Sequence, residues 1–158
     1  MRRILVATDG TESASDAELE AARLAAETQA ELVVLHVWEP LVVPDERGGW
    51  HAETLDELRL RAEPPFARAL AAAAAAGAHT TLEIVEGAPD REIPLLADRL
   101  NVDLVVLGAR RQHAFSRVLF GSVSRTVLEH LRHPLLVVKE GSVIHADGRA
   151  GQEQVPTG

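Results

Sequence analysis

Five short apolar runs alternate with segments of helical character along most of the chain. The runs are RILVAT (3–8), ELVVLHVW (31–38), TTLEIVE (80–86), VDLVVLG (102–108) and HPLLVVK (133–139). The intervening segments are rich in alanine or repeat apolar residues at the spacing of a helix. This alternation predicts parallel strands joined by helical crossovers, and the nearly continuous apolar strands predict a sheet covered on both faces. The expected fold class is α/β with a five-stranded parallel sheet.

The segments between the runs carry signals for where helices begin and break. Ser13 and Asp16 predict a capping box at the start of a helix over 13–29. Residues 39–50 hold two prolines and two glycines, which predict a loop. Pro64 and Pro65 predict a break within the helical segment 52–76. A helix over 87–101 follows, and one apolar face of the final helix is predicted from Val123, Val127, Leu128 and Leu131.

Composition limits the classes of protein that remain. A chain of 158 residues suits one domain, expected over 1–140, with a mobile C-terminal tail over 141–158. The absence of cysteine excludes disulfides and thiolate metal sites, and a net charge of −8 argues against general nucleic-acid binding. No signal peptide and no membrane span is evident, so we expect a cytoplasmic protein.

In an open parallel sheet, ligands bind beyond the carboxyl ends of the strands, where strand order reverses. Asp9 follows the first strand, where its carboxylate could accept hydrogen bonds from a ribose or help to hold Mg²⁺; it could equally stabilise only the turn. Val37, near the end of the second strand, is a candidate for an adenine pocket, with ordinary core packing as the alternative.

The end of the fourth strand carries the strongest local signal. Gly108 allows close backbone approach, and Gly121 with Ser122 opens a helix whose N–H groups and dipole favour an anion. The alternative is an ordinary helix start with serine as the N-cap. His130 and His133 lie three apart near a helix end without a third ligand, so we predict no metal site apart from possible Mg²⁺ at Asp9.

Residues 3–139 as a whole resemble the universal stress protein family. The resemblance rests on ILVATDGTESASDAELEAA, LVVLHVW, VEGAP, DLVVLGAR and GSVSRTVLEHLRHPLLVVK. Nucleotide-binding members carry glycine, two residues, glycine, nine residues, glycine, then serine or threonine. Gly108, Gly121 and Ser122 match this pattern with the right spacing, and Arg111 stands at the second glycine position.

The resemblance implies a flavodoxin-like or Rossmann-like three-layer α/β/α sandwich that binds ATP, an adenine nucleotide, across the strand ends. By matching positions, Ala7, Thr8 and Asp9 border the adenosine, Val37 the adenine, and Leu107 and Gly108 the adenosine from the fourth strand. Gly121, Ser122 and Val123 face the phosphates. The resemblance also implies a homodimer, paired through the last strand from Leu135 to Lys139.

Arg111 leaves two outcomes open at the phosphate end. Its guanidinium could clamp a phosphate, since a planar fork of donors suits that ligand. Alternatively, the altered loop could narrow the phosphate site and weaken nucleotide binding, because arginine adopts a backbone conformation that favours glycine only at a cost of about 1 kcal/mol. We expect nucleotide binding to be retained.

Three functions remain open from the sequence. The first is a dimeric stress-response regulator of bacterial type that binds ATP, with or without Mg²⁺. The second is a nucleotide-free dimer that acts through contacts with other proteins. The third is a slow Mg²⁺-dependent ATPase or phosphotransferase. No nucleophile–base pair is evident and Lys139 is the only lysine, so no catalytic residue is predicted and an enzyme is not expected.

Overall fold

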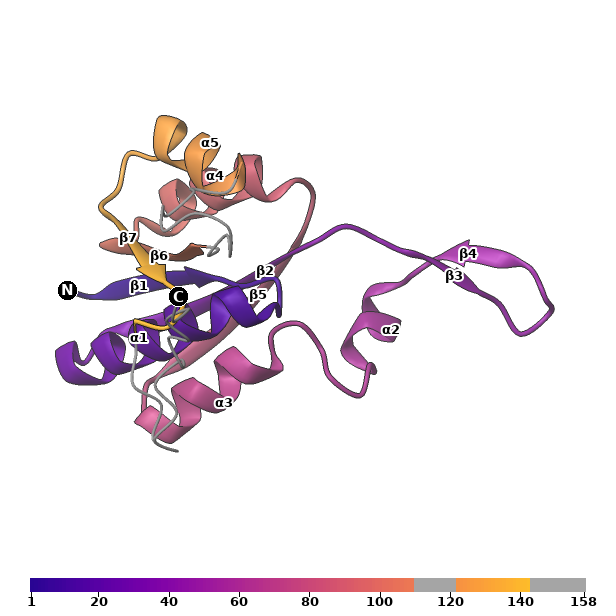
Figure 1. The fold of residues 1–158 in the computed structure, drawn as a ribbon, viewed down its shortest axis with the longest axis horizontal. Coiled ribbons are helices and arrows are strands. Elements are labelled where there is room, and N and C mark those ends of the chain that lie inside the picture. Colours follow the sequence, from indigo (N-terminus) through magenta and orange to yellow (C-terminus); the bar gives the residue numbers. More distant parts are fainter. Residues whose placement is uncertain (110–121, 143–158) are drawn as a thin grey trace, which may run out of the picture.

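The computed structural model describes residues 1–109 and 122–142, which form a parallel sheet between two layers of helices (Figure 1). The strands of this sheet are β1 (Arg3–Ala7), β2 (Glu31–Trp38), β5 (Thr80–Glu86), β6 (Leu104–Ala109) and β7 (Leu135–Lys139). They lie in the order β5-β2-β1-β6-β7, and each neighbouring pair is parallel. The predicted fold class is therefore confirmed. Strand order reverses between β1 and β6, which is where such sheets bind ligands.

Helices cover both faces of the sheet. α1 (Glu12–Thr28) and α3 (Ala67–Ala76) lie on one face, and α4 (Pro89–Leu100) and α5 (Ser122–His130) lie on the other (Figure 1). Side chains of β1 alternate between the two cores, so that Ile4 and Val6 pack under α1 and α3 while Leu5 packs under α4 and α5. No helix within 1–109 and 122–142 is long and apolar enough to cross a membrane.

The start of α1 differs from the predicted capping box. The N-cap is Thr11, and its side chain makes no capping hydrogen bond. Instead, the Asp9 carboxylate accepts the N–H of Thr11 at 2.9 Å, which fixes the turn two residues earlier than predicted. Asp16 is buried in the helix interior, where its carboxylate accepts the N–H groups of Gly141 and Ser142 at the end of β7. The capping-box prediction was wrong because α1 begins at Glu12, so Ser13 and Asp16 both lie within the helix.

The predicted apolar face of α5 is correct apart from Leu128. Val127 is fully buried, and Val123 and Leu131 pack against the same core. These three residues are spaced by four, whereas Leu128 lies about 100° further around the helix. Its side chain is accordingly 55% exposed.

Residues 39–66, which we call the arm, extend away from the sheet (Figure 1). The arm contains the antiparallel hairpin of β3 (Val42–Pro44) and β4 (Trp50–Ala52), then α2 (Leu55–Arg59). The prediction of a plain loop over 39–50 was therefore wrong. The proline pair does separate α2 from α3, as predicted.

The glycines that predicted a loop form the turn of this hairpin. The Asp45 carboxylate accepts the N–H groups of Arg47 at 2.7 Å and Gly49 at 2.8 Å. Gly48 has a φ of 80°, a left-handed conformation that glycine adopts without strain. A tight turn of this kind closes two short strands that have little hydrophobic periodicity of their own.

Candidate functional site

A pocket of about 300 Å³ opens where the carboxyl ends of β1, β2 and β6 meet the first turns of three helices. Its position at the reversal of strand order is the one expected of a ligand site in this fold. Its volume lies at the small end of the range for ligand pockets. The residues that line it are Ala7, Thr8, Asp9, Ser13, Ala14, Val37, Pro89, Ile93, Leu107, Gly108, Ser122, Val123 and Ser124.

Eight of the ten residues predicted from the sequence line this one pocket. They are Ala7, Thr8, Asp9, Val37, Leu107, Gly108, Ser122 and Val123. The other two, Arg111 and Gly121, lie outside the described residues. Segments separated by more than a hundred positions, such as those of Ala7 and Val123, therefore meet at one place, which is a property of the fold and not of any local motif.

The β1–α1 turn forms one wall of the pocket and is rigidly held. The Asp9 carboxylate accepts hydrogen bonds from the N–H of Thr11 and from its hydroxyl, the latter at 2.5 Å. It therefore stabilises the turn, which was one of the two roles that the sequence left open for it. Gly10 has a φ of 77°, and a Cβ atom there would lie 2.7 Å from the Cα of Pro65. Because Pro65 belongs to the arm, the base of the arm packs directly against a wall of the pocket.

Gly108 serves the packing of α1 against the sheet. A Cβ atom at this position would lie 2.4 Å from the carbonyl oxygen of Ser13 and 3.1 Å from the Cα of Ala14. The absence of a side chain therefore lets the first turn of α1 approach β6. The sequence analysis explained Gly108 by the close approach of a ligand. The structure shows that the packing of α1 on β6 also requires a glycine at this position.

A buried polar network supports the pocket wall from below. The Thr8 hydroxyl donates to Glu18, whose side chain is fully buried. Arg68 from α3 completes the network, with its Nε 2.6 Å from Oε2 of Glu18 and its Nη2 2.5 Å from the carbonyl oxygen of Thr11. The hydrogen bond to Glu18 raises the pKa of Arg68 above its ordinary value. His36 adds a further contact by donating from Nδ1 to the carbonyl oxygen of Thr8 at 2.9 Å.

Two helices present their first turns to the pocket together with hydroxyl groups. Ser13 and Ala14 come from α1, and Ser122, Val123 and Ser124 come from α5. The N–H groups in a first turn have no partner within their helix and carry a partial positive charge. Such a wall can donate several hydrogen bonds to an anionic group while the sheet side offers apolar contacts.

His130 and His133 contact different partners. His130 donates from Nδ1 to the carbonyl oxygen of Thr126 at 2.8 Å, whereas Nδ1 of His133 lies 3.5 Å from a carboxylate oxygen of Asp98. Across the part of the chain that is described, no three potential metal ligands cluster together.

The amino-acid sequence matches a known protein family. The model of the universal stress protein family matches residues 1–139. The chain belongs to the universal stress protein family. A universal stress protein of Methanocaldococcus jannaschii is 30% identical over 142 residues, which cover 88% of this chain and 82% of that protein.

Solved structures of other universal stress proteins share the fold. That of Archaeoglobus fulgidus in complex with dAMP has a TM-score of 0.64 and 21% identity, covering 88% of this chain and 98% of that one. The Arabidopsis thaliana family protein with AMP bound has a TM-score of 0.62 and 17% identity, covering 93% and 94%. A universal stress protein in complex with cAMP has a TM-score of 0.63 and 24% identity, covering 88% and 97%.

Several lining residues were missed by the sequence analysis. Ser13 was predicted only as part of a capping box and Ser124 only as a residue of the last helix, while Ala14, Pro89 and Ile93 have no distinctive chemistry. The Glu18–Arg68 pair was missed because its members are 50 residues apart and only the packing of α1 on α3 joins them. The serines gave the one usable signal, since each falls in the first turn of a helix that follows a strand end.

Proposed function

We propose that this protein binds an adenine nucleotide, with ATP as the ligand, in the pocket at the carboxyl ends of β1, β2 and β6. The observation that carries the proposal is the convergence of the eight predicted residues on that single pocket. The nucleotide complexes of related proteins support it, because proteins with this fold hold AMP, dAMP and cAMP. The role that we propose for this protein is that of a stress-response regulator that binds this nucleotide.

The character of each wall suggests how the ligand lies. Val37 and Ile93 supply apolar contacts of the kind an adenine ring needs. Thr8 and Asp9 border the ribose, while the Thr8 hydroxyl also donates to Glu18 and the Asp9 carboxylate also accepts from Thr11. Ser122 and Ser124 bring hydroxyls and the first turn of α5 to the phosphate side, with Gly121 and Arg111 in the preceding segment. If Mg²⁺ accompanies the phosphates, Asp9 is the candidate ligand, because it is the carboxylate among the residues that line the pocket.

The proposal also assigns a homodimer to the last strand. β7 is at one edge of the sheet, and Leu135, Leu136 and Val137 are partly exposed there. An apolar edge strand is a template for pairing with a second chain, and proteins usually cover it. We propose no catalytic residue, because the polar side chains of the pocket are those that stabilise the β1–α1 turn or lie in the first turns of α1 and α5.

The test begins with protein purified without added nucleotide. After denaturation, the released small molecules are identified, and thermal unfolding is then followed with ATP, ADP, AMP and GTP, with and without Mg²⁺. A ligand at a hundred times its Kd stabilises the folded state by about 2.7 kcal/mol, which raises Tm by about 5–10 °C. We expect this shift for adenine nucleotides and a smaller one for GTP. No shift with any nucleotide would instead support a module that works through protein contacts.

Arg111 is tested by its replacement with glycine, the residue that the family pattern has there. If the guanidinium clamps a phosphate, Arg111→Gly weakens ATP binding by about 1–3 kcal/mol and leaves adenosine binding unchanged. If the arginine strains the loop, the same change leaves ATP affinity equal or higher. The difference between ATP and adenosine separates the two outcomes in one titration series.

A further inference from the structure

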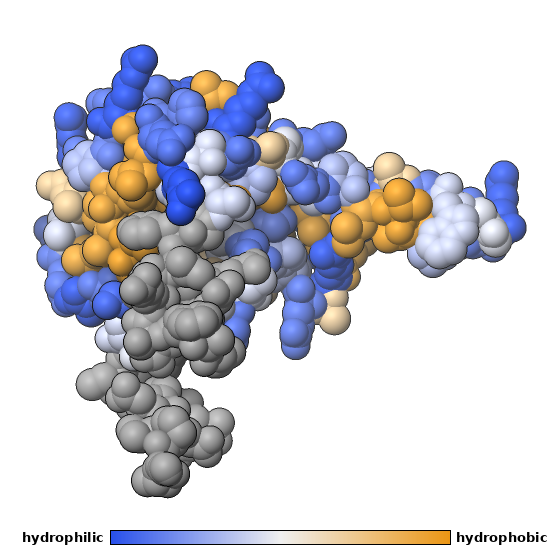
Figure 2. Space-filling view, turned by 45° about the horizontal axis from the view of Figure 1, so that its top comes forward, coloured by the Kyte–Doolittle hydropathy of each residue, from blue (hydrophilic) through white to orange (hydrophobic). Residues whose placement is uncertain are grey.

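The base of the arm and the start of α3 contact the β1–α1 turn at several points. Pro65 packs against Gly10, where a Cβ atom would lie 2.7 Å from the Cα of Pro65. Nη2 of Arg68 donates to the carbonyl oxygen of Thr11 at 2.5 Å, and Nε of Arg68 donates to Oε2 of Glu18 at 2.6 Å. The outer apolar surface of the arm, in contrast, lies away from the body of the molecule (Figure 2). The residues around position 65–68 are therefore the ones that hold the turn.

Glu18 extends the effect of Arg68 to the end of β1. Its side chain is fully buried, and its carboxylate accepts the Thr8 hydroxyl as well as the Arg68 guanidinium. A hydroxyl donates one hydrogen, and while that of Thr8 is committed to Glu18, its oxygen accepts the N–H of Gly10 at 3.1 Å. A buried carboxylate without a cation is costly, so this arrangement depends on the charge of Arg68. Arg68 thus holds the Thr11 carbonyl directly and the Thr8 hydroxyl through Glu18.

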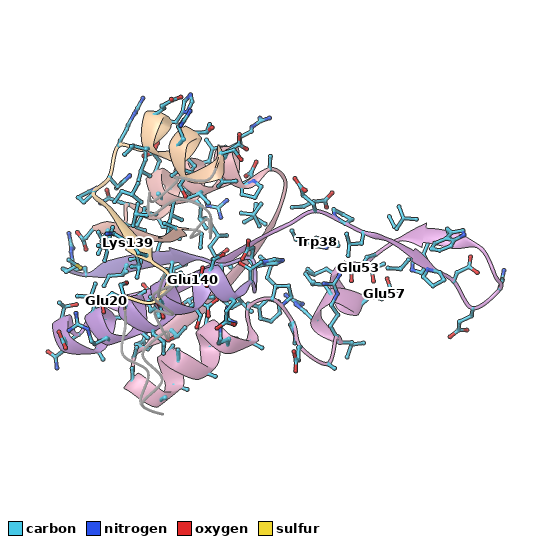
Figure 3. The ribbon with its side chains drawn as sticks, viewed as in Figure 1. Glu20, Trp38, Glu53, Glu57, Lys139 and Glu140 are labelled. Atoms are coloured by element: carbon cyan, nitrogen blue, oxygen red, sulfur yellow. The ribbon has the colours of Figure 1, made fainter. Side chains whose placement is uncertain are left out.

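A second buried contact fixes the arm where it leaves the sheet. Nε1 of Trp38, at the end of β2, donates to Glu53 at 3.2 Å, and Nε of Arg61 donates to the same carboxylate at 2.8 Å. The Glu53 side chain is only 4% exposed, so this junction is buried. Figure 3 shows Trp38 and Glu53 where the sheet meets the arm. With the arm held at both ends, the start of α3 that carries Arg68 has a fixed place beside the turn.

The turn that Arg68 holds is a wall of the pocket. Thr8 and Asp9 line the pocket, whereas Arg68 is not among the described residues that line it. The Asp9 carboxylate accepts both the N–H and the hydroxyl of Thr11, so its orientation follows that of Thr11. A change at Arg68 therefore reaches both lining residues, Thr8 through Glu18 and Asp9 through Thr11.

We propose that Arg68 is a positioning residue for nucleotide binding, which orders the wall formed by Thr8 and Asp9 before the ligand arrives. This inference rests on the proposed function. Without the guanidinium, the turn also adopts conformations that do not fit the ligand, and affinity falls with the fraction of molecules that remain competent. Because the turn borders the adenosine in the proposed site, the loss should be the same for ATP and for adenosine.

The experiment titrates adenosine and ATP into wild type and the double variant Arg68→Met with Glu18→Gln, at a temperature where unfolding curves show both to be folded. The double variant leaves no unpaired buried carboxylate and keeps the net charge of the protein, so neither unfolding nor overall charge explains a change in affinity. We expect both ligands to bind at least about tenfold more weakly, by the same factor. Arg23→Met is the matched control, because Arg23 pairs with Glu20 and Glu27 on the exposed side of α1. It should bind adenosine as the wild type does.

Amide exchange in the ligand-free protein provides a readout of the turn itself. The N–H groups of Gly10 and Thr11 donate to Thr8 and Asp9, and their protection should fall about fivefold or more in the double variant and stay unchanged in Arg23→Met. Equal nucleotide affinity in wild type and the double variant would overturn the inference alone, as would a loss confined to ATP, since Arg68 would then act through its charge. No binding by the wild type would overturn the proposed function, and the inference with it.

Discussion

Replacing Gly108 by alanine tests why a glycine stands at the end of β6. The new Cβ atom would lie 2.4 Å from the carbonyl oxygen of Ser13 and 3.1 Å from the Cα of Ala14, whereas ordinary contacts lie at 3.4–4 Å. Both neighbours are backbone atoms of the first turn of α1, so that turn must move by about 1 Å. Overpacking of this kind costs about 1–3 kcal/mol. We expect that loss of stability in the protein without any ligand.

The assay is urea unfolding of ligand-free wild type and Gly108→Ala, followed by nucleotide titration of both. Affinity should fall as well, because Ser13 and Ala14 line the pocket. Gly48→Ala is the control, since its Cβ atom would meet nothing within 4 Å and only the φ of +80° is unfavourable. It should cost about 1 kcal/mol and leave affinity unchanged. Unchanged ligand-free stability with weakened nucleotide binding in Gly108→Ala would refute the packing account.

Three further predictions concern buried and paired carboxylates. Arg68→Met leaves the fully buried Glu18 side chain without its cation and should lower the free energy of unfolding by about 2–4 kcal/mol, with part of the loss recovered in the double variant with Glu18→Gln. The backbone N–H of Thr54, donating to Glu57, lowers the pKa of that carboxyl to about 2, with His51 contributing less. Stability from this contact is present above about pH 4.5 and is lost as pH falls toward 2. The protection of the α2 amides, measured as their exchange rate relative to the intrinsic rate at each pH, should therefore fall over this range in the wild type and much less in Glu57→Gln. Asp16→Ala removes the acceptor for the two N–H groups that follow β7, and exchange of those two amides should accelerate about tenfold or more.

The strands of the sheet were the most predictable part of the fold. The predicted ranges 31–38 and 80–86 coincide with β2 and β5. β2 is predictable because a strand buried on both faces must be apolar almost throughout. β5 lies at the edge of the sheet and is instead predictable from Leu82 and Ile84, which alternate with polar residues. The site followed from the same logic, since carboxyl ends of neighbouring parallel strands must meet at one edge.

The arm and the buried network were not predictable in the same way. The hairpin depends on the Asp45 turn and on pairing of three-residue strands, which leave no periodicity to detect. The network joins Glu18 to Arg68 across two helices, and nothing local distinguishes either residue from a solvated charge. Contacts of this kind arise from how the elements pack, so they require the structure.

The central claim is that the pocket binds an adenine nucleotide, and calorimetric titration of ATP with Mg²⁺ into nucleotide-free protein tests it most directly. Val37→Trp is titrated in parallel, because a larger side chain at this position fills the apolar wall of the pocket. The account predicts saturable binding with a Kd in the micromolar range for the wild type, and at least about a hundredfold weaker binding for the variant. No heat of binding to the wild type at millimolar ATP, or equal binding by both proteins, would contradict it.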